Sequence, residues 1–137
     1  MTTIIYIVLG LVGLFVLLQV GLRLSVYLKK GKSAPDLSGK YAKAAKDSAP
    51  SLFYFYSEQC GACKPMTPVV EKLKKEYRNV FKVNIQKDMK TAKKFGVMGT
   101  PSTVIVQNGE IKQFWMGPQP EDKLRKHLNA SAAMQTA

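Results

Sequence analysis

Cysteine and histidine are scarce in this 137-residue sequence, which has two cysteines, Cys60 and Cys63, and one histidine, His127. A structural zinc site usually needs four Cys or His ligands. These three residues therefore make an incomplete site, and a metal would require two chains to share it. His127 is expected to be a surface residue of the last helix, and no metal is expected.

Charge is missing from the first 22 residues, and the run Ile4 to Leu22 is apolar except for Gln19. Nineteen such residues are about the ~20 that a helix needs to cross a bilayer. The basic start and the small-residue cleavage site of a signal peptide are both lacking, which favours a retained single-span anchor. A Gly-x-x-x-Gly motif is lacking too, so the anchor alone does not argue for a dimer.

Acidic residues are few, nine against 21 basic ones, which gives a formal charge of +12. Such a charge suggests nucleic-acid binding, but the lysines are spread over several segments without an aromatic and basic motif. We therefore expect a solvated surface and no nucleic-acid partner. The segment Arg23 to Asp47 has seven basic and two acidic residues, which favours contact with anionic membrane lipid.

The two cysteines form the pattern Cys60-Gly61-Ala62-Cys63. Two intervening residues allow both thiols to lie in one turn at a helix start, where a disulfide closes without strain. The helix N-terminus would stabilise a thiolate at Cys60, the expected nucleophile, and Cys63 would resolve the mixed disulfide. Two inert buried thiols are the alternative, but the small residues between them and the polar residues on either side argue against burial of both.

Hydrophobic periodicity divides the rest of the chain into a linker and one α/β domain. We expect an anchor and juxtamembrane helix over 1–28, a polar linker over 29–38, the domain over 39–129 and a frayed tail over 130–137. Within the domain we expect strands at Ser51–Tyr56, Val80–Ile85, Ser102–Gln107 and Ile111–Met116, and helices at Gly39–Asp47, Gly61–Tyr77, Met89–Phe95 and after Pro120.

Some finer expectations follow from single residues. Ser38 is a candidate N-cap for the first of these helices, and Pro68 should remove a hydrogen bond inside the long helix and bend it. Gly99-Thr100-Pro101 is where a cis peptide bond would present the backbone of Thr100 to the cysteines. The order of elements predicts a mixed sheet with a parallel crossover and a final hairpin.

Together these motifs resemble the thioredoxin family of disulfide oxidoreductases. Cys60-Gly61-Ala62-Cys63-Lys64 matches the family's Cys-Gly-Pro-Cys-Lys, Pro68 its helix proline and Gly99-Thr100-Pro101 its Gly-x-Pro. Asn108-Gly109-Glu110, Gly117 and Lys82 also fall in register. The resemblance implies a thioredoxin-like mixed β-sheet flanked by helices, here preceded by one N-terminal transmembrane helix and without the first strand of a full thioredoxin.

The resemblance also implies a substrate groove and a chemistry. Its walls would be the loop with Gly61 and Ala62, the Thr100-Pro101 backbone and the Met116-Gly117 loop, with Trp115 at its border. Lys82 would tune the pKa of the site, no cofactor beyond the Cys60–Cys63 disulfide would be needed, and the partners would be protein thiols and disulfides and an electron donor such as a reductase.

Departures from the family pattern lie close to the cysteines. Tyr54 replaces a buried carboxylate thought to deprotonate the resolving cysteine, and a phenol with a pKa of ~10 is a poor base near neutral pH. Gln59 replaces a tryptophan and Ala62 a proline, so the direction of electron flow is left open. A reductase, a periplasmic oxidase or isomerase, and a non-catalytic binding or assembly module all remain candidates.

Charge asymmetry around the apolar run predicts the side of the membrane on which the domain lies. Lys and Arg are absent before Leu22, whereas Arg23, Lys29, Lys30 and Lys32 follow it. Because positive residues stay on the cytoplasmic side, we expect a single-pass membrane protein with a cytoplasmic domain. A periplasmic domain is the alternative, by analogy with anchored relatives of this fold.

Overall fold

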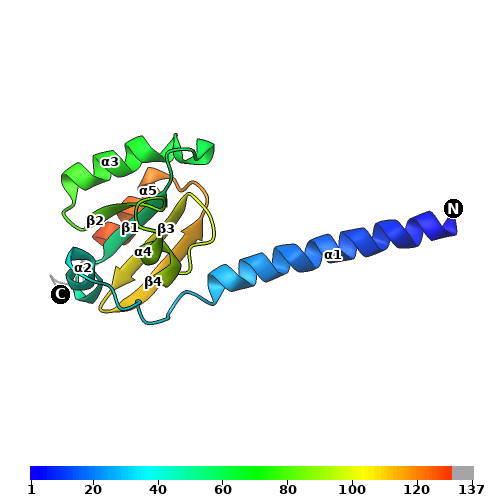
Figure 1. The fold of residues 1–137 in the computed structure, drawn as a ribbon, viewed down its shortest axis with the longest axis horizontal. Helices are drawn as coiled ribbons and strands as arrows, with labels where there is room; N and C mark the ends of the chain where they lie inside the picture. Colours follow the sequence, from blue (N-terminus) through cyan, green and yellow to red (C-terminus); the bar gives the residue numbers. More distant parts are fainter. Residues whose placement is uncertain (131–137) are drawn as a thin grey trace.

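The structure is a computed structural model that describes residues 1–130. A long helix, α1 (Thr2–Tyr27), extends away from an α/β domain (Figure 1). The elements of the domain are, in order, α2 (Lys40–Lys46), β1 (Ser51–Tyr56), a short 3-10 helix η1 (Gly61–Cys63), α3 (Met66–Glu76), β2 (Val80–Asn84), α4 (Met89–Lys94), β3 (Ser102–Gln107), β4 (Glu110–Met116) and α5 (Glu121–Asn129). The predicted mixed sheet with flanking helices is confirmed.

The four strands form one sheet in the order β2-β1-β3-β4. β1 is parallel to β2 and antiparallel to β3, and β3 and β4 form an antiparallel hairpin. At the hairpin turn both Asn108 and Gly109 have positive φ angles, 52° and 74°, as the Asn-Gly pair of a tight hairpin requires. The sheet is thus the four-stranded version expected from the sequence.

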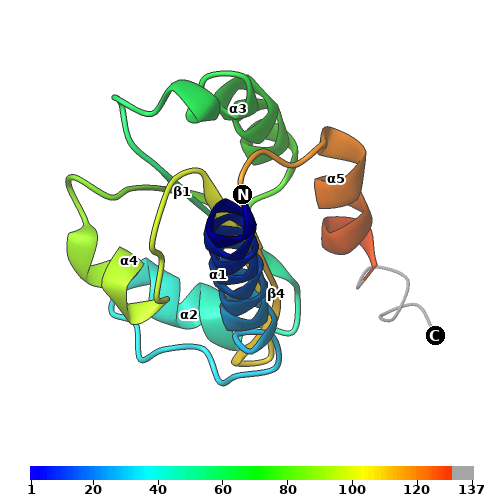
Figure 2. The same ribbon diagram turned by 90° about the vertical axis from the view of Figure 1, so that its right-hand side faces the viewer.

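Strand β1 is buried on both of its faces because successive side chains point to opposite sides of the sheet. Phe53 and Phe55 pack on the side of α2 and α4, whereas Leu52 and Tyr54 pack on the side of α3 and α5. Figure 2 shows these two pairs of helices separated by the sheet. The uninterrupted apolar run that predicted a central strand therefore corresponds to two separate cores.

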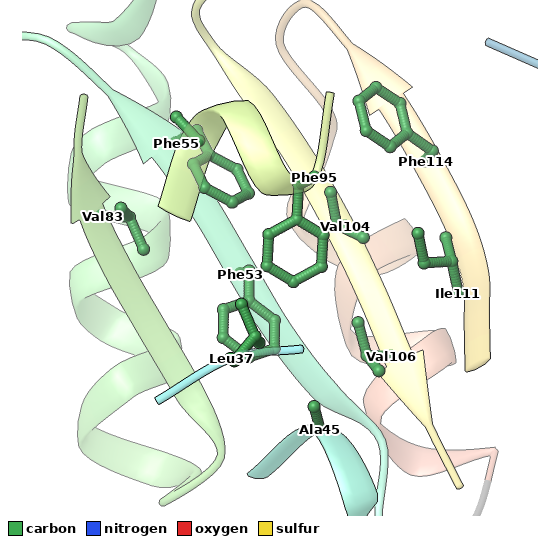
Figure 3. Packing of buried hydrophobic residues seen from close by; sticks show 11 residues of the cluster. Leu37, Ala45, Phe53, Phe55, Val83, Phe95, Val104, Val106, Ile111 and Phe114 are labelled. Carbon is green, nitrogen blue, oxygen red and sulfur yellow. The ribbon is translucent and has the colours of Figure 1, made fainter. Parts of the chain in front are cut away.

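The core on the α2 and α4 side is built around phenylalanine rings (Figure 3). The ring centroid of Phe95 lies 5.1 Å from that of Phe53 and 5.4 Å from that of Phe55. Burial of one such side chain stabilises a fold by about 1.5–3 kcal/mol. This cluster therefore holds the end of α4, and the chain that follows it, against the centre of the sheet.

Two sequence-based expectations about helix starts are wrong. The N-cap of α2 is Gly39, with φ 60° and no capping side chain, rather than Ser38. The single helix expected from Gly61 to Tyr77 is divided into η1 and α3, with Pro65 at the N-cap of α3. Pro68 is the third residue of α3, where an N–H has no intrahelical partner in any case, so it removes no interior hydrogen bond.

Residues 31–34, expected to be part of a polar linker, are bound to the outer edge of β4. The Gly31 N–H donates to the Ile111 carbonyl at 2.7 Å, the Ile111 N–H to Lys32 at 2.8 Å and the Ala34 N–H to Gly109 at 2.7 Å. Gly31 has φ 83°, which favours glycine. Leu37 follows with 7% exposure in the core beneath α2. The connection between α1 and the domain is therefore an ordered antiparallel contact.

The core on the α3 and α5 side provides a test of the packing. Leu124 is fully buried there, so Leu124→Ala should lower the free energy of unfolding by about 2–5 kcal/mol. Urea titration of the full chain in detergent, followed by near-UV circular dichroism, measures this change. Met89→Ala, at a side chain with 46% exposure, should change it by less than about 0.5 kcal/mol. Equal midpoints for the two variants would contradict this description of the core.

Candidate functional site

The segments singled out in the sequence meet at one end of the sheet. The cysteine loop follows the last residues of β1, and Phe55 of β1 pairs with Ser102 at the start of β3. Ser102 also pairs with Met116 at the end of β4, and the Gly117 N–H donates to the Pro101 carbonyl at 2.8 Å. The Thr100-Pro101 peptide bond is cis. The cysteine loop, Thr100-Pro101 and Met116-Gly117 thus share this end.

Cys60 and Cys63 form a disulfide with a Cα–Cα distance of 5.3 Å, inside the usual range. Cys60 is the N-cap of η1, and its Sγ accepts a hydrogen bond from the Cys63 N–H at 3.1 Å. Cys60 is half-buried, whereas Cys63 is only 2% exposed. One sulfur is therefore open to a partner and the other is shielded, and the same N–H is available to stabilise a thiolate on Cys60.

The group closest to Cys60 that could stabilise a thiolate differs from the one expected. A long helix starting at Gly61 would have placed Cys60 at the positive end of a helix dipole. η1 has only three residues, and α3 starts at Met66, so the direct N–H of Cys63 replaces the dipole of a continuous helix as the nearest stabilising group.

Tyr54 lies beneath the cysteine loop and is fully buried. The Thr67 hydroxyl donates to the Cys63 carbonyl at 2.9 Å. The Tyr54 hydroxyl lies 3.2 Å from Thr67 Oγ1 and 3.3 Å from the Cys63 carbonyl, and it donates its one proton to one of them. Burial raises the pKa of Tyr54, so the phenol is neutral at physiological pH. The Tyr54 hydroxyl thus lies against the backbone of Cys63 and the side chain of Thr67.

Lys82 lies beside Tyr54 on β2, but its side chain turns to Glu71 of α3, with which it forms an ion pair. Its Nζ also lies 4.8 Å from the ring centroid of Tyr56. The hydrogen bond from Lys82 lowers the pKa of Glu71. The positive charge lowers the pKa of Tyr54 as well, but by less than burial raises it. The ammonium group of Lys82 is therefore held between Glu71 and the ring of Tyr56.

Two polar residues of the site were not identified from the sequence. Thr67 lies four residues after Cys63, a helical spacing that would have placed the two side by side. The Glu58 carboxylate accepts a hydrogen bond from Asn84 Nδ2 at 3.2 Å and lies 3.6 Å from Lys87. Both residues border a hollow of about 370 Å³ beside the disulfide, which is lined by Tyr56, Ser57, Glu58, Cys60, Cys63, Lys64, Thr67 and Pro68.

The predicted groove residues lie in the cysteine loop, just before β3 and at the end of β4. Gly61 and Ala62 are exposed, and Met116 is 39% exposed, with its Cε 3.8 Å from the place of a Cβ on Gly99. The Trp115 ring packs against His127, at 5.0 Å between centroids, and Lys123 Nζ lies 4.6 Å above it. His127 is half-buried there, and burial lowers its pKa.

Comparison with known proteins agrees with this geometry. The thioredoxin family model matches residues 35–130, which is most of the chain. The chain belongs to the thioredoxin family. It is 33% identical over 99 residues to the thioredoxin of Rickettsia typhi, covering 70% of this chain and 93% of that one. The thioredoxin of Bacillus subtilis is 31% identical over 78 residues, covering 55% and 75% of the two chains.

Solved structures lead to the same family. A mutant thioredoxin of Halobacterium salinarum has a TM-score of 0.59 and 29% identity, covering 74% of this chain and 96% of that one. Fasciola hepatica thioredoxin has a TM-score of 0.55 and 26% identity, covering 63% and 84%. The Cys60–Cys63 pair in this family identifies the domain as a protein-disulfide oxidoreductase. Thioredoxins act on protein disulfides, are reduced by a reductase and need no cofactor beyond the redox-active disulfide.

The role of Tyr54 can be tested by removing its hydroxyl. Tyr54→Phe should lower the free energy of unfolding by about 0.5–1.5 kcal/mol and leave the shape of the pH–rate profile unchanged between about pH 6 and 9. The profile is measured as the rate of reduction of a soluble disulfide. A lost or shifted limb in that profile would make the phenol a proton-transfer group.

Alkaline pH provides a second measurement on the same variant. Because the pKa of Tyr54 is raised in the folded state, the unfolded chain loses this proton first. The stabilising contribution of Tyr54 is therefore complete below about pH 10 and declines above it. Tyr54→Phe should lose less stability than the unsubstituted chain above that pH, whereas Thr67→Val, which keeps the phenol, should retain the full alkaline decline.

Proposed function

We propose that this thioredoxin-family chain is a membrane-anchored reductase that uses Cys60-Gly61-Ala62-Cys63 on the disulfides of other proteins. The unequal burial of the two sulfurs carries the proposal. Cys60 is half-buried and accepts an N–H, whereas Cys63 is shielded and supported by Thr67 and Tyr54. This arrangement suits attack by the first thiolate and resolution by the second.

The exchange transfers two electrons in two steps. The Cys60 thiolate attacks one sulfur of the partner disulfide, which forms a mixed disulfide and releases the other partner sulfur as a thiolate. The Cys63 thiolate then attacks Cys60 Sγ and displaces the second partner sulfur. The partner leaves as a dithiol, and the chain is left with the Cys60–Cys63 disulfide seen in the structure. A reductase would return it to the dithiol.

The partner is proposed to lie across the cysteine loop and the two segments beside it. Backbone groups next to a cis-proline can pair with an extended peptide as an added strand. Lys82 is proposed to tune the site through Glu71 and the tyrosines. The proposed contact residues are Gly61, Ala62, Thr100, Pro101, Trp115, Met116 and Gly117.

Membrane anchoring is supported by α1, whose segment Thr2–Ser25 is predominantly apolar, exposed and long enough to cross a bilayer. Helices of this length and composition also occur in signal sequences, and the retained anchor is the form that we propose. The basic residues after the span support a cytoplasmic domain, where the thiol pool is reducing. Net positive charge beside the span supports contact with anionic lipid.

Two other functions would need different observations. A periplasmic oxidase or isomerase would require the opposite orientation of α1. A non-catalytic binding or assembly module is favoured only by Tyr54, since the phenol cannot replace the carboxylate base of thioredoxins. The shielded Cys63 and the open Cys60 favour turnover over this alternative.

The order of the two cysteines can be tested by trapping. Cys63→Ser should accumulate a mixed disulfide between Cys60 and a partner, because the resolving thiolate is missing. Non-reducing electrophoresis followed by mass spectrometry of the linked peptides identifies the bond. Cys60→Ser is the matched control and should show neither trapping nor turnover above background. Trapping through Cys63 would reverse the assignment, and an inactive unsubstituted chain would favour the binding module.

The side of the membrane can be tested in intact cells with the Cys63→Ser variant, in which Cys60 is the only thiol. A membrane-impermeant maleimide should leave Cys60 unlabelled until the membrane is permeabilised. The permeabilised sample shows that the thiol is reactive. Labelling of Cys60 in intact cells would instead place the domain outside and support a periplasmic oxidase or isomerase.

A further inference from the structure

The register of the sheet shows which end of the domain α1 leaves. Going back along the chain, Ala34 bonds to Gly109 before β4, and Gly31 and Lys32 bond to Ile111 near its start. Leu22 and Arg23 then border Phe114, Trp115 and Met116 at its end. The chain therefore runs antiparallel to β4. α1 leaves the domain at the end of the sheet where Met116 lies and projects outward from it.

The Met116 end of β4 is also the end at which the disulfide lies. Met116 pairs with Ser102 of β3, and Ser102 pairs with Phe55, close to the end of β1 from which the cysteine loop starts. Figure 1 shows α1 extending from the side of the domain on which α3 begins. Figure 2 looks along α1 from its N-terminal end and therefore onto this end of the sheet.

Side-chain contacts hold α1 in this direction. Lys29 Nζ lies 4.5 Å from the ring centroid of Phe114 and donates to the Gly96 carbonyl. Together with the backbone bonds of residues 31–34, these contacts fix the chain on both sides of Lys30. The last turns of α1 and the end of β4 border an open hollow of about 400 Å³ lined by Leu22, Arg23, Phe114, Trp115 and Met116.

The apolar span reaches this hollow. Leu22 belongs to the segment Thr2–Ser25 that is apolar enough to cross a membrane, and Thr2 lies roughly 30 Å further out at 1.5 Å per residue. A bilayer around this segment would have its surface close to Trp115 and Met116. Met98 and Met116, 60% and 39% exposed, present flexible apolar side chains on the same end.

We propose that the Cys60–Cys63 pair faces the bilayer and exchanges disulfides with integral-membrane proteins, at cysteines within the first turns outside a membrane span. This inference rests on the proposed function for the exchange step, and it names the partner class. The partner segment would be the end of a transmembrane helix beside α1, with its apolar side chains against Met98 and Met116. A soluble globular partner would have to enter between the domain and the lipid.

Reporter helices with one cysteine at graded heights test the partner class. Each reporter spans the vesicle membrane, continues as a rigid helix and carries its cysteine as an activated disulfide with a chromogenic thiol. Attack by Cys60 in full-length Cys63→Ser joins the reporter to Cys60 and releases the chromogenic thiolate. We expect the chromogenic thiolate to be released about tenfold faster from a reporter whose cysteine is one turn outside the bilayer than from a reporter whose cysteine is four turns outside. Four turns place the cysteine about 22 Å from the bilayer surface.

A flexible spacer provides the matched variant. About 20 Gly and Ser residues inserted between Leu28 and Lys29 would let the domain move about 25 Å from α1 while keeping its own contacts. This variant should lose the preference for the near cysteine, and the same spacer before Thr2 should keep it. Equal rates at all heights in the chain without a spacer, or faster release at the distant cysteine, would overturn the inference.

A small soluble activated disulfide separates this inference from the proposed function. If Cys63→Ser reacts normally with this compound but shows no preference for the near reporter cysteine, only the proposed position of the site is overturned. If Cys63→Ser does not react with this compound, the proposed chemistry is overturned. The orientation of the domain on the membrane is then decided by the fluorescence of Trp115.

Trp115 is the only tryptophan in the sequence and borders Leu22, so its fluorescence reports the height of the domain. Lipids with a spin label on the headgroup should quench Trp115 about twofold more than lipids labelled at the chain end. The spacer after Leu28 should remove most of this quenching, and the spacer before Thr2 should not. Headgroup quenching that is absent, or the same in all three chains, would overturn the proposed orientation.

Discussion

Backbone pairing of β1 on both edges, together with burial on both faces, is the constraint on which the site depends. β2 and β3 hold the strand in register, and the two clusters around Phe53 and Tyr54 prevent it from shifting. Since a one-residue slip would exchange the two faces, the end of β1 has one position. The cysteine loop starts there, and the same register brings Pro101 and Met116 to it.

The strong periodic signals in the sequence predicted the fold well. β3 begins and ends at the predicted residues, and the Asn108-Gly109 turn was identified because both positions need positive φ angles. The disulfide pair and its Gly-Thr-Pro neighbour were found from local motifs alone. Such features depend on residues close in the chain, and for this reason they can be recognised without coordinates.

Features that depend on distant contacts were not predicted. The pairing of residues 31–34 with β4 uses backbone groups, which leave no pattern in the side chains. The break between η1 and α3 could not be seen because Pro65 and Pro68 are both compatible with a helix start. Tyr54 was recognised as a departure from a buried acid, but its support of Cys63 through Thr67 required the positions of three segments.

The pairing of residues 31–34 with β4 also bears on self-association. In an open sheet, unpaired backbone groups along an outer strand are a template for strand addition and aggregation. Here the first half of the β4 edge is occupied by the chain's own Gly31 to Ala34. The other outer strand, β2, has five residues, with the charged Lys82 at its centre. A protein concentrated in the plane of a membrane would thus have little edge through which copies could polymerise.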